Sequence, residues 1–475
     1  MTDPLLPKSE KLSLSTKLAY GAGDLGAGLT ATLLGLSLQF FFTNVAGLSP
    51  LLAGTVLLIG KISDAINDPI IGVMSDRTQS RWGRRHSWML MGAIPFGFFF
   101  FLQWIIPRFS ADPHLNQWAL FWYYVAIGVL FNIAFTAVNL PYTALTPELT
   151  QDYNERTSLN SFRFAFSISG SILILVGGFF ADKMIASPTQ RYWLLGLGGG
   201  ILSILSTYWC VWGTQERYTT STTAESIPIL KQIKIALSNR PFLYVMGIYL
   251  CSWLAFQLTI TIIPYFVKYR MERGDSYFDV ALIVQMVAFI MLFVWSAISK
   301  RIGKRMVYFM GMSVWIIAQA GLFFLQPGQV RLMYLLSMMA GVGVATAYLI
   351  PWSMLPDVIE LDELTTGKRR EGTFYAFMTL LQKMSLALAI FIVGLVLEKT
   401  GFQPLDPPES ARLAIQVAIG PLPTIILLVG LVLAYFYPIT PEVHAEILLK
   451  LRERRLGLDE ASQQGPPQMD VMDES

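Results

Sequence analysis

Long apolar stretches recur along the whole chain and are separated by short polar segments. Each stretch contains about 20 or more mostly hydrophobic residues, the length that an α-helix needs to cross a lipid bilayer. The pattern therefore predicts an all-α membrane protein with twelve transmembrane helices. We place them near residues 18–42, 50–74, 87–107, 117–145, 158–181, 191–213, 241–267, 277–298, 306–326, 332–355, 373–397 and 411–437.

Composition supports this class, and the distribution of charge orients the chain. Hydrophobic residues make up 54% of the sequence and charged residues 14%, whereas soluble domains carry about 25% charged residues. Most of the 35 Lys and Arg residues lie in the two tails and in the loops on the same side. The positive-inside rule then predicts that both termini are cytoplasmic. We expect a multi-pass protein of the plasma (inner) membrane without a cleavable signal peptide.

Two pairs of segments repeat at an offset of about 210 to 220 residues. NLPYTALTPELTQDYNERT (139–157) is echoed by LIPWSMLPDVIELDELTTGKRREGT (349–373), and RWGRRHSW (81–88) by RIGKRMVY (301–308). Such a repeat predicts two parallel six-helix halves around a central site, the major-facilitator architecture, which works by alternating access. The expected divisions are an N-terminal half (1–213), a cytoplasmic linker (214–240), a C-terminal half (241–437) and a cytoplasmic tail with a disordered end (438–475).

Charged residues gather at the helix ends of these repeated segments. Acid–Arg pairs at a moving interface are suitable switch contacts, so we predict that they latch the helix ends of the two halves together at an inward gate. Ordinary anchoring of basic loops at the membrane surface is the alternative. The predicted gating residues are Asp76, Arg77, Arg84, Glu148, Arg156, Asp357, Arg370 and Glu371.

The apolar stretch at 50–74 contains three ionisable residues, Lys61, Asp64 and Asp68. Their i, i+3, i+7 spacing places them on one helix face, and a rise of about 1.5 Å per residue puts Asp64 near the bilayer midplane. Charges at that depth are costly unless they are neutralised. The pattern indicates a site for a monovalent cation or a proton, to which Asn67 and Thr136 can add oxygen atoms. A buried Lys–Asp clamp between helices is the alternative.

Several motifs together resemble the glycoside–pentoside–hexuronide:cation symporters, over about residues 15–437. They are SDAINDPIIG (63–72), SRWGRR (80–85), the Pro–aromatic end of the fourth predicted helix and TGKRREGTFY (366–375). The resemblance implies symport of a sugar or glycoside with sodium or a proton. It also implies that Lys383 stands near the two aspartates. The cation-binding residues are then Asp64, Asn67, Asp68, Thr136 and Lys383.

Candidate substrate-binding residues are polar or aromatic groups expected to face a central cavity. In the galactoside transporters of this family, two acidic residues grip the sugar hydroxyls, and the matching positions here are Gly28 and Asn139. Carboxylates make selective contacts to hydroxyls, so their loss weakens the expected grip on galactosides. The candidates are Asp24, Asn139, Arg163, Tyr348, Thr379 and Gln382.

Two alternatives to a sugar symporter remain open. YLIPWSMLPDVIE (348–360) is similar to the vertebrate sodium-dependent lysophosphatidylcholine symporters, which makes a lysophospholipid or another amphipath an alternative substrate. A non-transporting scaffold or sensor is the second alternative, but it gives no reason to bury Asp64 and Asp68. The sequence contains no nucleophile–base pair or histidine cluster, so we predict no enzyme activity. The expected partners are a small-molecule substrate, a monovalent cation and the bilayer, with no nucleic acid and no cofactor besides the transported Na⁺ or H⁺.

Overall fold

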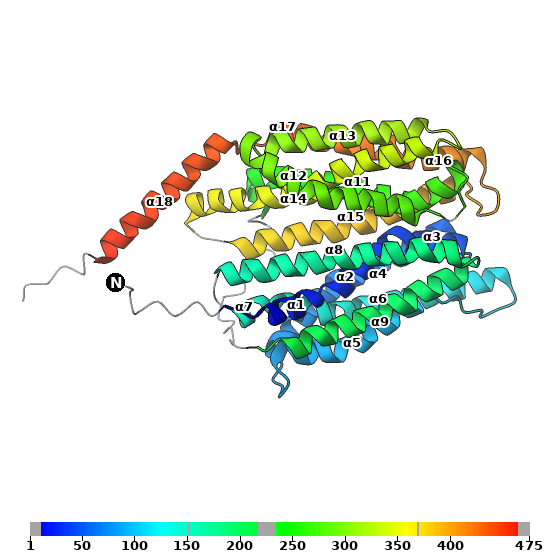
Figure 1. The fold of residues 1–475 in the computed structure, drawn as a ribbon, viewed down its shortest axis with the longest axis horizontal. Coiled ribbons are helices and arrows are strands. Elements are labelled where there is room, and N and C mark those ends of the chain that lie inside the picture. The colour runs from blue at the N-terminus through cyan, green and yellow to red at the C-terminus, as the bar shows by residue number, and fades with distance from the viewer. Residues whose placement is uncertain are drawn as a thin grey trace, which may run out of the picture.

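The computed structural model describes residues 11–150, 153–216, 234, 236–274, 276–367 and 370–463, in which no strand occurs (Figure 1). The N-terminal helices are α1 (Leu14–Ala22), α2 (Leu25–Leu33), η1 (Leu34–Leu38), α3 (Gln39–Asn44), α4 (Pro50–Arg77), α5 (Arg84–Leu102), α6 (Pro113–Ala144), α7 (Thr146–Leu149), α8 (Tyr153–Met184) and α9 (Pro188–Gly213). The C-terminal helices are α11 (Arg240–Tyr265), η2 (Phe266–Arg270), α12 (Phe278–Ile302), α13 (Lys304–Phe324), α14 (Val330–Thr366), α15 (Glu371–Lys399), α16 (Glu409–Ile419), α17 (Pro421–Tyr435) and α18 (Pro441–Gln463). The all-α prediction is confirmed.

The helices form two groups, which we call the N half (α1–α9) and the C half (α11–α17). In the N half, α2 packs on α8, α4 on α6, and α5 on both α6 and α9; in the C half, α14 packs on α12 and α13, and α11 on α15 and α17. Figure 1 shows the N half below and the C half above. The halves meet where α4 packs on α15 and α8 on α12. Residues 217–233 and 235 of the predicted linker lie outside the described residues.

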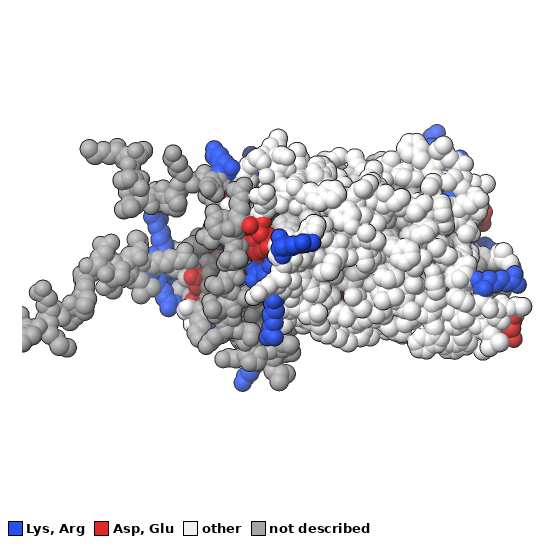
Figure 2. All heavy atoms as spheres, turned by 90° about the horizontal axis from the view of Figure 1, so that it is seen from below, with Lys and Arg blue, Asp and Glu red and all other residues white. Residues whose placement is uncertain are grey.

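Most of these helices are suited to a membrane. Ten helical segments of the described chain are long and apolar enough to cross a bilayer, and α4 and α5 are not among them. These two helices nevertheless run beside α6, which is one of the ten. Figure 2 shows a middle zone almost without charged atoms, with Lys and Arg gathered toward the two ends. The structure is therefore that of a multi-pass membrane protein.

The helical bundle has two ends, which we call the tail end and the far end. The tail end holds the start of α1, the end of α14 and helix α18, and the far end holds the α3–α4 and α15–α16 connections (Figure 1). At the tail end, α5 and α13 each follow a glycine with the same unusual backbone, Gly83 at φ +96° and Gly303 at φ +84°. Residues other than glycine rarely adopt this backbone conformation. Its recurrence at matching repeat positions agrees with the predicted duplication.

One helix at the tail end is longer than predicted, and another was not predicted. Helix α14 continues to Thr366, eleven residues past the expected end of its span at 355, because Asp357 and Asp362 find cationic partners along it. The end of the tail was expected to be disordered, but helix α18 continues to Gln463. Its sequence is rich in Leu, Lys, Arg and Glu, which are good helix formers. Residues 464–475 lie outside the described residues.

Candidate cation and substrate sites

Two aspartates of α4, a threonine of α6 and a lysine of α15 meet in one cluster. The Lys383 ammonium lies 3.0 Å from Asp64 Oδ2 and also contacts Asp68 Oδ2. Thr136 Oγ1 lies 3.2 Å from Asp64 Oδ1 and 2.9 Å from Asp68 Oδ1. A hydroxyl has one proton, so Thr136 can donate to only one aspartate at a time. We call these four residues the carboxylate cluster.

A second lysine on α4 borders the carboxylate cluster. Lys61 Nζ lies 3.7 Å from Asp64 Oδ2 and donates to Asn132 Oδ1 at 3.4 Å. Asn132 in turn donates to the Gly60 carbonyl at 3.1 Å, across the α4–α6 contact. Asn132 was not among the predicted residues; its spacing of four residues from Thr136 is the signal that puts both on one face of α6. Lys61 thus bonds to the Asn132 side-chain amide, and it lies farther from the aspartates than Lys383 does.

The exposure of the cluster is uneven. The Asp64 side chain is 1% exposed, whereas Asp68 is 31% and Lys383 24% exposed. Solvent or an ion can therefore approach from the side of Asp68 and Lys383. Asn67, which was predicted as a further ligand, is only half-buried, and its buried Nδ2 atom has no hydrogen-bond partner among the described residues. The geometry brings four of the five predicted cation-binding residues together and leaves Asn67 beside them.

Two of the predicted substrate residues form an ion pair in the N half. Arg163 Nε of α8 donates to Asp24 Oδ2 at 3.2 Å, and Asp24 sits buried at the break between α1 and α2. The Arg163 guanidinium also lies 5.6 Å from the Tyr142 ring centre. Gly28, which replaces a family carboxylate, packs so closely on α8 that an added Cβ would lie 2.0 Å from the Ser167 carbonyl oxygen. No side chain fits there without moving a helix.

The other predicted substrate residues lie in different surroundings. Tyr348 belongs to an aromatic group, with its ring centre 5.1 Å from Trp253 and 5.2 Å from Phe256. Thr379 donates to the Tyr375 carbonyl of its own helix. The side-chain amides of Asn139 and Gln382 form no hydrogen bond with described residues, so they are available to a ligand. Trp253 and Phe256 were missed because isolated aromatics in an apolar helix carry no distinguishing pattern.

Comparison with known proteins identifies the class of this chain. The family described as MFS/sugar transport protein matches residues 19–441. The chain belongs to this family. It is therefore a transporter of the major facilitator superfamily and not an enzyme, as the sequence predicted. The uncharacterized symporter sll1374 of Synechocystis sp. is 49% identical and covers 94% of this chain and 98% of its own length.

More distant relatives differ in what their names say they carry. The isoprimeverose transporter of Lactiplantibacillus pentosus is 29% identical over 82% of this chain and 81% of its own length. Sodium-dependent lysophosphatidylcholine symporter 1 of Mus musculus is 26% identical, with 96% and 91% covered. The crystal structure of a D-xylose–proton symporter has a TM-score of 0.65 at 15% identity, with 89% and 96% covered, and shares the fold.

At the tail end of this transporter, the predicted gating residues pair inside the halves. In the N half, Glu148 lies 2.5 Å from Arg84 Nη2 and 3.0 Å from Arg85 Nε, and Arg85 Nη2 lies 2.5 Å from Asp76. Arg156 Nε donates to the Thr150 carbonyl, and Arg77 is exposed. Each of these contacts between described residues lies within one half, so none of them forms the expected latch between the halves.

The C half repeats the arrangement with other residues. Lys304, which follows Gly303 as Arg84 follows Gly83, lies 2.7 Å from Asp357 Oδ1. Arg370 Nε donates to Asp362 at 3.1 Å. Glu371 begins α15, next to this pair. These contacts again stay within one half, so the tail end consists of two separate networks of ion pairs.

The segment after α9 is tied to the N half by Glu216. Its carboxylate accepts the backbone N–H groups of Arg84, Arg85 and His86, each at 2.8 Å, at the start of α5. Partial burial disfavours the charged carboxylate, but the hydrogen bonds from the His86 side chain and from these backbone groups outweigh it. They lower the pKa of Glu216 to about 2. Glu216 was not predicted, because a carboxylate that caps a helix 130 residues earlier has no local signal.

At the far end, hydrogen bonds cross between the halves. Tyr265 pairs with Thr43 at 2.7 Å, Tyr277 with Ser37 at 3.0 Å, and Tyr192 with Tyr277 at 2.5 Å. Tyr269 also contacts Asn44. Among the described residues, no hydrogen bond or ion pair joins the halves at the tail end. In this conformation the halves are therefore bonded to each other at the far end, while the described residues of the tail end bond within their own half.

Proposed function

We propose that this transporter is a symporter that couples a monovalent cation, bound at the carboxylate cluster, to the movement of a sugar or glycoside. The observation that supports it most is the pairing of Asp64 and Asp68 with Lys383. These carboxylates lie in a helix that packs against the apolar helices α6 and α15, where unpaired charges are costly. Lys383 belongs to the other half, so whatever replaces its ammonium also changes a contact between the halves.

The cluster suggests how the cation acts. In this conformation Lys383 pairs with both aspartates, and an incoming cation competes for the same oxygen atoms. When the cation binds, Lys383 is released and the link between α4 and α15 is altered. A ligand shifts a conformational equilibrium only by its different affinity for the two states, and this exchange provides that difference.

Sodium suits the cluster better than a proton. Carboxylate and hydroxyl oxygens are hard ligands, and the cluster offers four carboxylate oxygens with the Thr136 hydroxyl between them. Thr136 can rotate its single proton away and present lone pairs to an ion. A proton would need only one carboxylate and would give Thr136 no role.

A sugar or glycoside is the substrate that the family favours. Asn139, Gln382 and the outer guanidinium nitrogens of Arg163 can contact hydroxyl groups, and the rings of Tyr348 and Trp253 offer apolar faces. An amphipathic lysophospholipid is the second candidate, because the tight packing at Gly28 leaves no room for the carboxylate of galactoside transporters. The similarity to the mouse lysophosphatidylcholine symporter also supports it.

We further propose that the tail end faces the cytoplasm, with both termini there, in the plasma (inner) membrane. The excess of basic residues in the tails and tail-end loops supports this orientation. The present conformation would then be open toward the cytoplasm. The two halves would rock about the carboxylate cluster, in agreement with the division of the chain into halves at the linker.

A ligand screen on purified full-length protein tests the proposed function. Sugars, glycosides and lysophospholipids would be added singly, each with Na⁺ or with choline as the balancing cation, and the melting temperature measured. A ligand that binds the native state stabilises it according to its affinity. We expect stabilisation by a sugar or glycoside that is larger with Na⁺. Stabilisation by lysophospholipids alone would shift the proposal to the second substrate, and stabilisation that is the same in both salts would refute sodium coupling.

A further inference from the structure

Helix α18 is docked against the tail end of the C half at several points. At its start, Pro441 packs on Gly303, where an added Cβ would lie 3.0 Å from Pro441 Cγ. Further along, Ile447 and Leu451 are buried. Arg454 Nη1 reaches the Leu364 carbonyl at 3.5 Å, near the end of α14. The helix thus lies against the part of the C half that carries the Lys304–Asp357 pair.

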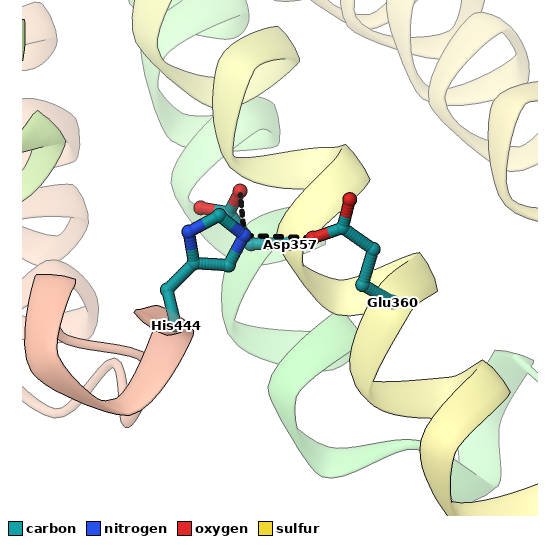
Figure 3. Close-up of side chains that lie close together, drawn as sticks. All are labelled: Asp357, Glu360 and His444. Atoms are coloured by element: carbon teal, nitrogen blue, oxygen red, sulfur yellow. Dashed lines mark hydrogen bonds and ion pairs between the residues drawn. The ribbon is translucent and has the colours of Figure 1, made fainter. Parts of the chain in front are cut away.

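A second polar contact fastens α18 to α14 between these points. Figure 3 shows the His444 ring of α18 pointing at Asp357 and Glu360 of α14. Its Nε2 atom lies 2.7 Å from Glu360 Oε2 and 3.3 Å from Asp357 Oδ1. Neutral imidazole has one N–H and no net charge, whereas imidazolium is attracted by both carboxylates. His444 is 28% exposed, so protons from solution can reach it.

The charged groups around His444 come from four parts of the chain. Asp357 and Glu360 belong to α14, and Lys304 at the start of α13 lies 2.7 Å from Asp357. Tyr437, in the segment before α18, has a buried hydroxyl that forms no hydrogen bond with a described residue. On α18 itself, Glu446 pairs with Lys450 and adds no net charge. Two carboxylates against one ammonium leave a net charge of −1 facing the ring, which favours a cation at His444.

A proton fits this place better than a metal ion. Asp357, Glu360 and His444 are close enough to hold a metal, but the Lys304 ammonium would repel a divalent ion. Nitrogen and oxygen ligands at about 2.0–2.1 Å around a tetrahedral zinc lie roughly 3.3 Å apart, whereas Nε2 and Oε2 are 2.7 Å apart. That separation is a hydrogen-bond distance.

We propose that His444 is a proton-responsive latch that docks α18 on the tail end of the C half. Histidine is the side chain that most readily changes its charge around neutral pH. A protonated His444 attracts both carboxylates and holds α18 tightly. A neutral ring keeps one hydrogen bond, so at higher pH α18 depends on its apolar contacts and the Arg454–Leu364 hydrogen bond, and it loosens. The inference rests on the fold and does not depend on which cation or substrate is transported.

Hydrogen exchange of the full-length protein between pH 5.5 and 8.0 tests the latch. After correction for intrinsic exchange, we expect the α18 amides to become roughly tenfold better protected at the acidic end, the factor expected for one charge-assisted hydrogen bond. His444→Asn should remove this change, and His444→Lys, which keeps a cation at every pH, should give protection that is constant. His114→Asn, at the far end, is the matched control and should behave as wild type.

Three results would overturn the proposal. Protection of α18 that does not vary with pH in the wild-type protein would show that His444 does not act as a latch. A pH response that survives in both His444 variants would assign it to other groups. Micromolar Zn²⁺ should leave the protection unchanged, and a Zn²⁺-dependent gain lost in His444→Asn would favour a metal site instead. Normal size-exclusion behaviour of each variant would confirm that it is folded.

Discussion

The far end and the tail end of this transporter are held together in different ways. At the far end, tyrosine hydroxyls bond across the halves. At the tail end, ion pairs such as Arg84–Glu148 and Lys304–Asp357 stay inside one half. A neutral hydrogen bond contributes about 1 kcal/mol net, whereas breaking a buried ion pair costs about 3–5 kcal/mol. The weak contacts therefore lie where the halves must separate, and the strong ones keep each half rigid.

Between the two ends lies the carboxylate cluster, where charge crosses between the halves. Lys383 of the C half reaches Asp64 and Asp68 of the N half. The cluster therefore consists of ion pairs, as the tail-end contacts do, but it joins the two halves, as the far-end contacts do. When this contact opens, the aspartates need another positive charge in place of Lys383. The proposed cation supplies that charge.

The largest effect is expected from Asp68→Asn, which removes charge from the contact between the halves. We predict that uptake against a gradient falls to the level of empty proteoliposomes, because the cation loses one of its two carboxylates. Downhill exchange of substrate should persist, since the two halves can still move. Asp406→Asn, whose side chain is 91% exposed at the far end, is the control. Normal accumulation by Asp68→Asn would mean that the cluster does not couple transport.

The next largest effect is expected at the tail end from Glu148→Gln. Glu148 is 2% exposed and pairs with both the half-buried Arg84 and the buried Arg85, so its neutral replacement leaves these two cations with a weak partner. We predict a loss of stability of about 3–5 kcal/mol, seen as a lower melting temperature. Glu446→Gln, which breaks an exposed pair on α18, should leave the melting temperature unchanged. Equal melting temperatures for the two variants would show that the tail-end pairs do not hold the half together.

A smaller effect is expected at the far end from Tyr277→Phe. This change removes hydrogen bonds to Ser37 and Tyr192 and keeps the ring, so stability should hardly change. At about 1 kcal/mol for each bond, the conformational equilibrium should shift roughly 5- to 30-fold toward a far end that is open.

Spin labels at two exposed far-end positions, Leu115 and Leu405, measure that shift as a second, longer distance population. Tyr435→Phe, on the exposed surface of α17, is the control. If Tyr277→Phe leaves the distance distribution unchanged, the tyrosine contacts do not set the closure of the far end.

The smallest effect is expected from Glu216→Gln and depends on pH. The pKa of Glu216 is lowered to about 2 from the ordinary 4.5. Its stabilisation is therefore complete above pH 4.5 and is lost as the pH falls toward 2. The melting temperature of the variant should lie below that of the wild type at pH 6, and the gap should narrow as the pH falls below 4.5. A gap that stays constant down to pH 3 would mean that the charge of Glu216 does not matter.

The sequence was most informative where signals are local. Apolar length predicted the helices, and spacing predicted that Asp64 and Asp68 share a face. The pairing of Lys383 with residues more than 300 positions earlier came from family resemblance, because spacing within one helix carries no information about which distant helix will pack on it. The same limit hid Asn132, Glu216 and the docking of α18.

The predicted gate shows a second limit. Asp76, Arg84, Glu148 and Asp357 were expected to pair, and they do, but within the halves. Charge type and helix-end position indicate that such residues find partners, while the partner depends on the conformation. The far-end tyrosines, Tyr265 and Tyr277, were not among the predicted residues. Their role in closing the far end became visible only from the packing of the two halves.

Sodium titration by calorimetry tests the central claim most directly. The claim is that Na⁺ binds at Asp64 and Asp68 in competition with Lys383. Purified wild-type protein should bind Na⁺ at a single site, Lys383→Gln should bind it more tightly, and Asp68→Asn should give no binding heat. Substrate should raise the Na⁺ affinity of the wild type by the same factor by which Na⁺ raises that of the substrate. The same Na⁺ affinity in all three proteins would contradict the account.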